Sequence, residues 1–172
     1  MKYVICKNKH NSIGNKLRFH RGLTTYYFNT RIGTDWFNKY PHGINKLCGF
    51  TMGGLFDRIH RNSIRIGWKP SNDLEEYINL YLYWYDEKVS LTYQSRFICK
   101  AKADTIVRGV IKPIRVDEID NITVDLCVGI TNYTLTIPYH LPDKLWGRFC
   151  YPYYGGPLTS PNTKHFSILQ HM

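Results

Sequence analysis

The stretch HRNSIRIGWKP, residues 60–70, places an arginine in the middle of a predicted β-strand. Successive side chains of a strand point to opposite faces, and three apolar residues alternate here: Ile64, Ile66 and Trp68. The opposite face carries a hydroxyl, a guanidinium and a bare backbone, from Ser63, Arg65 and Gly67. A charge beside a buried face is costly unless it has a partner. We therefore expect Arg65 to meet either an anionic ligand or a carboxylate just beyond the strand, from Asp73, Glu75 or Glu76.

The next predicted strand, residues 77–85 (YINLYLYWY), has one apolar face and one face of tyrosines broken by a single asparagine. If the two strands pair as neighbours in a meander, their apolar faces must agree. Arg65 then lies on the tyrosine side, where it can stack on rings or direct its guanidinium at a carboxylate or phosphate. Either the tyrosines cover a half-exposed sheet, or Tyr81 and Tyr83 form a stacking surface for sugars or bases. Gly67 would let a ring or a ligand approach the backbone.

Two sequence motifs resemble an uncharacterised group of small proteins of Bacteroidetes bacteria and their phages. The motifs are H-x-N-S-x-R-x-G-W, met here at residues 60–68, and a late aromatic PYFGG-like stretch, met here as PYYGG at 152–156. The resemblance implies no function, but it implies that the two motifs belong to one unit and makes a phage origin plausible. The predicted ligand-binding residues therefore come from both motifs and the tyrosine strand: His60, Arg61, Asn62, Arg65, Trp68, Tyr81, Tyr83, Tyr153 and Tyr154.

Motifs for catalysis or metal binding are weak in this sequence. Asp57, His60 and Ser63 lie close together, but a catalytic triad is defined by geometry and not by sequence proximity. The sequence has no G-x-S-x-G elbow, no H-E-x-x-H and no C-x-x-C pair. The glycine-rich GFTMGG, residues 49–54, lacks the lysine of a phosphate loop and is predicted to be a plain loop. We expect no catalytic residues, no metal and no cofactor, and hence a protein that is not an enzyme.

The positive charge is concentrated in the first part of the chain. The net charge of the 172 residues is +10. Residues 1–70 hold thirteen Lys and Arg against two Asp and Glu, a net of +11, and the remainder has a net of −1. Such a field attracts anions: nucleotides, nucleic acid or an acidic surface.

About ten short strands separated by turns predict one all-β domain over residues 1–172. We expect an antiparallel β-sandwich, jelly-roll-like or a flattened barrel, with long N-terminal loops and little helix. Residues 34–47 break the strand pattern and are predicted to hold one helical turn, capped by Thr34 or Asp35. Tight turns are expected at 86–88 and at 129–132.

The function expected from these observations is non-enzymatic binding of a small anionic ligand of the nucleotide or cyclic-nucleotide type. In a phage, such a protein could sequester a host immune signal. A carbohydrate-binding or virion structural module is the alternative, and a nucleic-acid binder is the second. The sequence leaves open whether the protein forms a homo-oligomer. No membrane partner is expected, because no segment approaches the apolar length of a membrane helix.

The five cysteines are odd in number and widely spaced, so we expect free thiols and a cytoplasmic protein, in the host cytoplasm if viral. Alkylation of the denatured protein without reductant should label all five. Mass spectrometry that finds two or more native disulfides would contradict this expectation.

Overall fold

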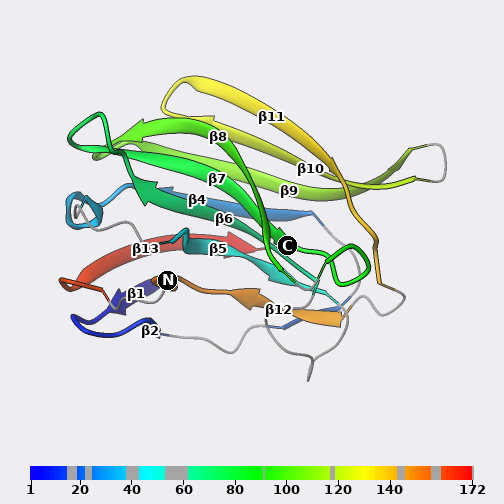
Figure 1. Ribbon diagram of the computed structural model, residues 1–172, viewed down its shortest axis with the longest axis horizontal. Helices are drawn as coiled ribbons and strands as arrows, with labels where there is room; N and C mark the ends of the chain where they lie inside the picture. The colour runs from blue at the N-terminus through cyan, green and yellow to red at the C-terminus, as the bar shows by residue number, and fades with distance from the viewer. Residues whose placement is uncertain are drawn as a thin grey trace.

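A computed structural model describes residues 1–14, 19–21, 25–37, 43–52, 62–90, 92–116, 119–142, 146–155 and 160–171. The described residues form antiparallel strands and one short helical turn (Figure 1). The elements are β1 (Lys2–Ile5), β2 (Ile13–Gly14), β3 (Phe19–Arg21), β4 (Tyr26–Arg31), η1 (Thr34–Trp36), β5 (Asn45–Thr51), β6 (Ser63–Pro70), β7 (Tyr77–Tyr85), β8 (Gln94–Lys102), β9 (Ile106–Val116), β10 (Ile119–Val128), β11 (Thr131–Pro138), β12 (Trp146–Cys150) and β13 (Lys164–His171).

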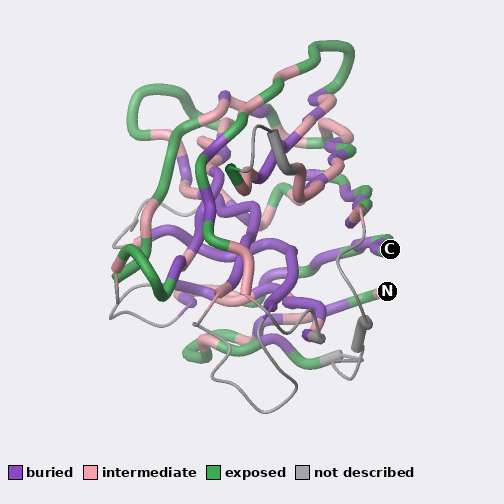
Figure 2. The backbone as a smooth tube through the Cα atoms, turned by 90° about the vertical axis from the view of Figure 1, so that its right-hand side faces the viewer, coloured by how far each residue is buried: buried purple, intermediate pink, exposed green. Residues whose placement is uncertain are grey.

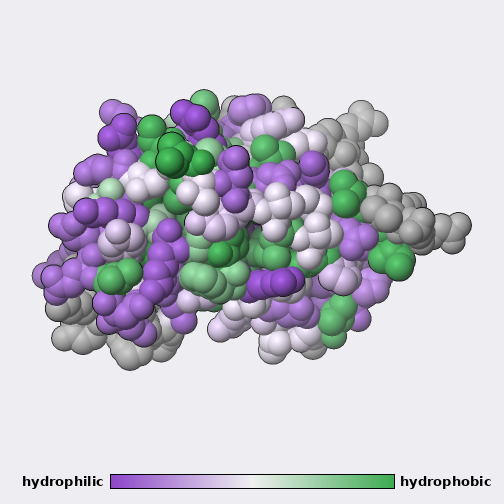
Figure 3. Space-filling view, turned by 90° about the horizontal axis from the view of Figure 1, so that it is seen from above, coloured by the Kyte–Doolittle hydropathy of each residue, from purple (hydrophilic) through white to green (hydrophobic). Residues whose placement is uncertain are grey.

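The strands form two antiparallel sheets, which confirms the predicted sandwich. The seven-stranded sheet has the order β11-β10-β9-β4-β13-β1-β2, and the six-stranded sheet has the order β3-β12-β5-β6-β7-β8. The sheets do not close into a barrel, because β11 and β8 are edge strands of different sheets. From above, apolar side chains gather along the middle of the molecule between hydrophilic ones (Figure 3).

The core lies between the sheets, where the buried backbone runs through the middle of the molecule (Figure 2). One layer of it comes from the apolar face of β6 and β7, as the alternation predicted. Both faces of β5 and β6 are buried, however, with only Lys69 of the two strands partly exposed. The described part of the chain contains no helix long and apolar enough to cross a membrane.

The turns lie where the sequence predicted them, but some of their details differ from the prediction. The hairpin between β10 and β11 turns at 129–130, and β7 joins β8 after a turn that starts at Asp86. The predicted helical turn is the short 3₁₀ helix η1, but its N-cap is Gly33 and no side chain caps it. The prediction that GFTMGG is a loop is wrong for residues 49–51, which belong to β5.

Trp36 of η1 connects the two sheets. Its ring lies 5.2 Å from Trp68 of β6 and 4.7 Å from Phe166 of β13, and its Nε1 donates to the His165 carbonyl at 3.0 Å. The side chain is fully buried. A single residue of a very short helix thus fills the space between the layers.

We expect Trp36→Ala to lower the free energy of unfolding by about 3–5 kcal/mol, the usual cost of emptying a large aromatic site. Urea denaturation would measure the change. Ile130→Ala, at an exposed turn, is the control and should stay within about 0.5 kcal/mol of the original chain. A loss below about 1 kcal/mol for Trp36→Ala would show that the sheets do not depend on this contact.

Candidate functional site

Arg65 lies at the centre of the outer face of the six-stranded sheet, the face turned away from the core. The β6–β7 register pairs Arg65 with Tyr83 and Ser63 with Tyr85, so the predicted meander and the predicted side of Arg65 are both correct. Only 3% of the Arg65 side chain is exposed. The outer face at this point is therefore a buried polar cluster and not an open sheet surface.

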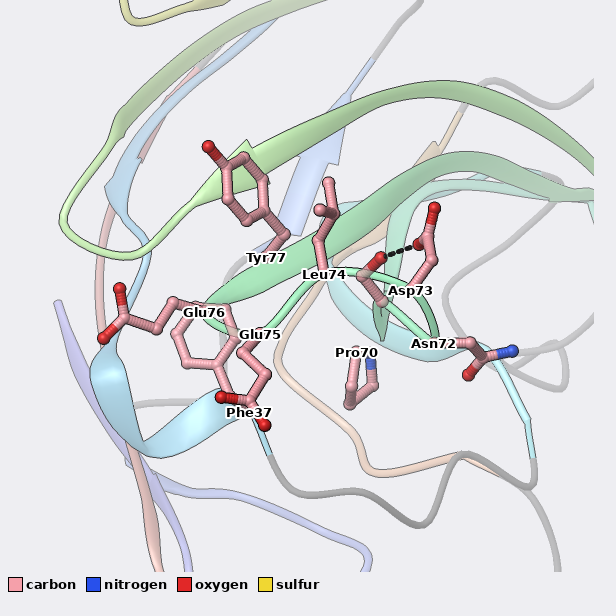
Figure 4. A pocket seen from close by; sticks show the side chains of 9 residues that line it. Phe37, Pro70, Asn72, Asp73, Leu74, Glu75, Glu76 and Tyr77 are labelled. Atoms are coloured by element: carbon pink, nitrogen blue, oxygen red, sulfur yellow. Dashed lines mark hydrogen bonds between the residues drawn. The ribbon is translucent and has the colours of Figure 1, made fainter.

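Two of the carboxylates expected as partners of Arg65 are engaged elsewhere. Asp73 pairs with Lys100, and Glu76 lies 3.9 Å from Lys102, both lysines belonging to β8. Asp73 also accepts a hydrogen bond from Ser71 in the loop that follows β6 (Figure 4). This loop lines a hollow whose charged side chains are all acidic, so the hollow does not suit an anion.

A β-bulge in β5 brings Lys46 to the buried polar side chains around Arg65, which we call the Arg65 cluster. Lys46 pairs with Gly67, while Cys48 pairs with Ile66 and Gly49 with Arg65, so the register shifts between Lys46 and Cys48. Without this extra residue, strict alternation from Gly49 would turn Lys46 into the core. The bulge places Lys46 on the outer face instead.

Lys46 is 8% exposed and lies between two tyrosine rings. Its Nζ is 4.7 Å from the ring centre of Tyr83 and 5.3 Å from that of Tyr153. Burial, and to a smaller extent the nearby Arg65 charge, lower the pKa of Lys46 to about 8. Close to neutral pH, a measurable share of this amine is therefore uncharged and able to accept a proton.

Tyr83 and Tyr85 form a hydrogen-bonded pair beside Arg65. The Tyr83 hydroxyl donates to the Tyr85 hydroxyl at 3.1 Å. Burial, together with this hydrogen bond, raises the pKa of Tyr83. The Tyr83 hydroxyl therefore keeps its proton near neutral pH, and the half-buried Tyr85 carries the pair toward solvent.

Tyr83 does not present an open ring. Tyr93 stacks on it at 4.8 Å between ring centres, from the side of β8, while Lys46 approaches from the side of β5. The Tyr83 ring is therefore already in contact with other side chains, and its hydroxyl is bonded to Tyr85. Tyr81 is half-buried on the same face, where it pairs with Gly67 and Phe97.

Two further polar groups belong to the cluster. Ser63 is fully buried, and among the described residues its Oγ has no hydrogen-bond partner. Cys150 lies beside Gly49 in the adjacent strand β12; burial raises the pKa of its thiol, and Arg65 acts in the opposite direction. A buried hydroxyl without a partner next to an arginine is an arrangement that a bound polar ligand completes.

The late aromatic motif reaches this cluster through Tyr153. Its backbone exchanges hydrogen bonds with Lys46, at 2.8 Å and 2.9 Å, and its ring stacks on His10 at 5.6 Å. Tyr153 is half-buried, so it forms part of the rim. Two motifs that are far apart in the sequence thus meet at Lys46.

Several predicted site residues lie elsewhere. Trp68 and Tyr154 are buried on the core side, with Lys164 Nζ 5.8 Å from each ring, so they cannot share a ligand with Arg65. Asn62 is bonded to Glu87 in the turn after β7. His60 and Arg61 lie outside the described residues.

The expected approach of a ligand to the Gly67 backbone is wrong, because Ile44 fills the space. A Cβ added at Gly67 would lie 2.3 Å from the Ile44 side chain. A side chain of the protein itself, and not a ligand, requires the glycine. No group of three or more metal-ligating side chains occurs among the described residues.

No family model and no curated protein sequence matches this chain. Among solved structures, the chain is similar to the alginate lyase vAL-1 from Chlorella virus, with a TM-score of 0.52 and 16% identity over 99% of this chain and 84% of the lyase. It also matches a legume lectin-like domain from Entamoeba histolytica, with a TM-score of 0.45 and 16% identity over 98% of this chain and 83% of that domain. At this identity, the likeness to the lyase shows a shared jelly-roll-like fold.

The lowered pKa of Lys46 can be tested by NMR of the lysine side chains. Two resonances should titrate near pH 8, because Lys164 is a second buried lysine with a pKa of about 8. Lys46→Met should remove one of them and Lys164→Met the other. Arg65→Met should raise the pKa of Lys46 but leave that of Lys164 unchanged. If every lysine titrates near the ordinary value of 10.5, the described electrostatics of the cluster are wrong.

Proposed function

We propose that the Arg65 cluster binds an acidic polysaccharide built of uronate sugars and cleaves it by β-elimination. The observation that carries the proposal is the close grouping of a buried arginine, a lysine with a lowered pKa and a hydrogen-bonded tyrosine pair on one sheet face. These are the three kinds of group that an elimination next to a carboxylate needs. The proposal keeps the anionic ligand expected from the sequence and joins it to the carbohydrate alternative.

Arg65 supplies the positive charge. In β-elimination, the proton removed is on the carbon next to the sugar carboxylate, and the electrons released move toward that carboxylate. A guanidinium that binds the carboxylate oxygens stabilises this charge where it develops. Burial strengthens the interaction, because the surrounding dielectric is low.

Lys46 is the proposed base. In its neutral form, the amine takes the C5 proton, and the C5–H electrons become the C4=C5 double bond. The bond from C4 to the linking oxygen breaks in the same sequence of events. A base works best with a pKa near the working pH, and a pKa of about 8 meets this condition better than the ordinary 10.5.

The tyrosine pair is the proposed acid. The leaving oxygen needs a proton, and Tyr85, itself hydrogen-bonded to Tyr83, can donate it. The products are one chain that begins with an unsaturated uronate and one that ends in the freed hydroxyl. No oxidant, reductant or water is consumed, so the elimination balances with these groups alone.

The comparison with solved structures supports the substrate class. The similar viral protein is an alginate lyase, and alginate is a polymer of uronate sugars. A nucleotide binder would also use Arg65, but it would have no need of a neutral amine or of a proton-donating pair. The excess positive charge in residues 1–70, which includes Lys46 and Arg65, suits a polyanion.

The decisive measurement is the ultraviolet absorbance of the conjugated double bond that forms when a panel of polyuronates is cleaved. Arg65→Ala should lower kcat/KM about 10²–10³-fold, as when one preorganised donor is lost. Lys46→Gln should lower it about 10²–10⁴-fold, the range for a general base. The matched control is Arg108→Ala, an exposed arginine of the other sheet, which should leave the rate unchanged.

The pH dependence has a defined sign. Because the folded pKa of Lys46 is lowered to about 8, the neutral amine accumulates as the pH rises through 8, and kcat/KM should rise with it and then level off. The same protein should be titrated with cyclic and linear nucleotides, oligonucleotides and glycans. Absence of cleavage for every polyuronate would refute the lyase. Binding of a nucleotide that Arg65→Ala abolishes would instead favour the non-enzymatic function.

A further inference from the structure

Two aromatic side chains next to the Arg65 cluster are exposed. Phe97 lies in the edge strand β8, and 50% of its surface is exposed. Tyr93 lies just before this strand, and 49% of its surface is exposed. Isolated apolar residues on a surface need no explanation. These two, however, flank Ser95, which pairs with Tyr83 of the cluster, so they lie on the same outer face as the proposed reaction centre.

Both rings are held in position by tyrosines of β7. Tyr93 stacks on Tyr83 at 4.8 Å with 20° between the planes. Phe97 meets Tyr81 edge to face, at 5.8 Å and 72°. Each exposed ring therefore has one side or edge packed against the protein and the remainder turned to solvent. Rings fixed in this way lose little conformational entropy when a ligand stacks on them.

The two rings lie on neighbouring tyrosines of the outer face. Tyr83 and Tyr81, which these rings contact, are two residues apart in β7, about 7 Å at 3.3 Å per residue. Tyr83 pairs with Arg65, so the Tyr93 ring lies beside the proposed reaction centre and the Phe97 ring lies farther along the strand. A polysaccharide that is bound at Arg65 and extends along β7 can therefore contact both rings.

We infer that Tyr93 and Phe97 are stacking platforms for sugars next to the cleaved linkage, an inference that rests on the proposed lyase function. The apolar C–H face of a sugar ring packs on an aromatic ring, while its carboxylate turns to the cations. Tyr83 cannot serve in this way, because Tyr93 and Lys46 already contact its ring. The protein thus binds a chain of several uronates and discriminates against short fragments.

The test compares substrates of different length. The affinity and KM for uronate oligomers of increasing length would be measured for Phe97→Ala, Phe97→Trp and Tyr93→Ala. We expect Phe97→Ala to weaken binding of long oligomers about tenfold, toward the lower end of the loss of one stacking platform, with a smaller effect on kcat. Phe97→Trp should restore the affinity. Leu169→Ala is the control, because Leu169 is 60% exposed on the other sheet and should leave binding and cleavage unchanged.

Calorimetric binding is measured separately from cleavage, so the two proposals can fail independently. Binding that improves with oligomer length in the original chain but not in Phe97→Ala supports the platforms, even if no cleavage is seen. Cleavage with the same length dependence in Phe97→Ala and Tyr93→Ala as in the original chain overturns the platforms and leaves the lyase standing. Absence of any uronate binding overturns both.

Discussion

The register of β6 against β7 is the constraint on which the site depends. Ile64, Ile66 and Trp68 pair with Trp84, Leu82 and Leu80, and all six side chains belong to the core. A slip by one residue would turn every apolar side chain of β6 outward and bury Arg65 in the core. The hydrophobic cost of that slip fixes Arg65 opposite Tyr83. The position of the polar cluster is thus set by the apolar face behind it.

The second constraint is the bulge in β5, which puts a second cation beside the first. Lys46 and Arg65 are both almost entirely buried, and the Arg65 charge adds to burial in lowering the pKa of Lys46. A buried amine near a guanidinium releases its proton more easily than one in water. The arrangement costs folding stability, and it leaves more of the amine neutral and able to accept a proton near neutral pH. Functional sites commonly combine burial and like charges in this way, so that the pKa of a reactive group is shifted.

The cluster is assembled from segments that are distant in sequence. β5 supplies Lys46, β6 supplies Arg65, the hairpin of β7 and β8 supplies the tyrosines, and the chain after β12 supplies Tyr153. Each segment is held by strand pairing or by backbone hydrogen bonds, so the polar groups are fixed by structures whose stability comes from the core. Fixed donors and acceptors are what an electrostatic mechanism requires.

The sequence by itself determined the all-β sandwich, the pairing of β6 with β7 and the side on which Arg65 lies, because alternation with period two reports directly which face of a strand packs on the core. It could not reveal Lys46, since a bulge breaks that alternation and leaves no clear mark in residue types; residues 49–51 were predicted as a loop for a similar reason. Nor could it separate Tyr153 from Tyr154: neighbours in an irregular segment point to opposite sides, and only tertiary contacts decide which one meets Lys46. The charge on Lys46 also depends on the structure alone, because burial and the distance to Arg65 are properties of the folded chain.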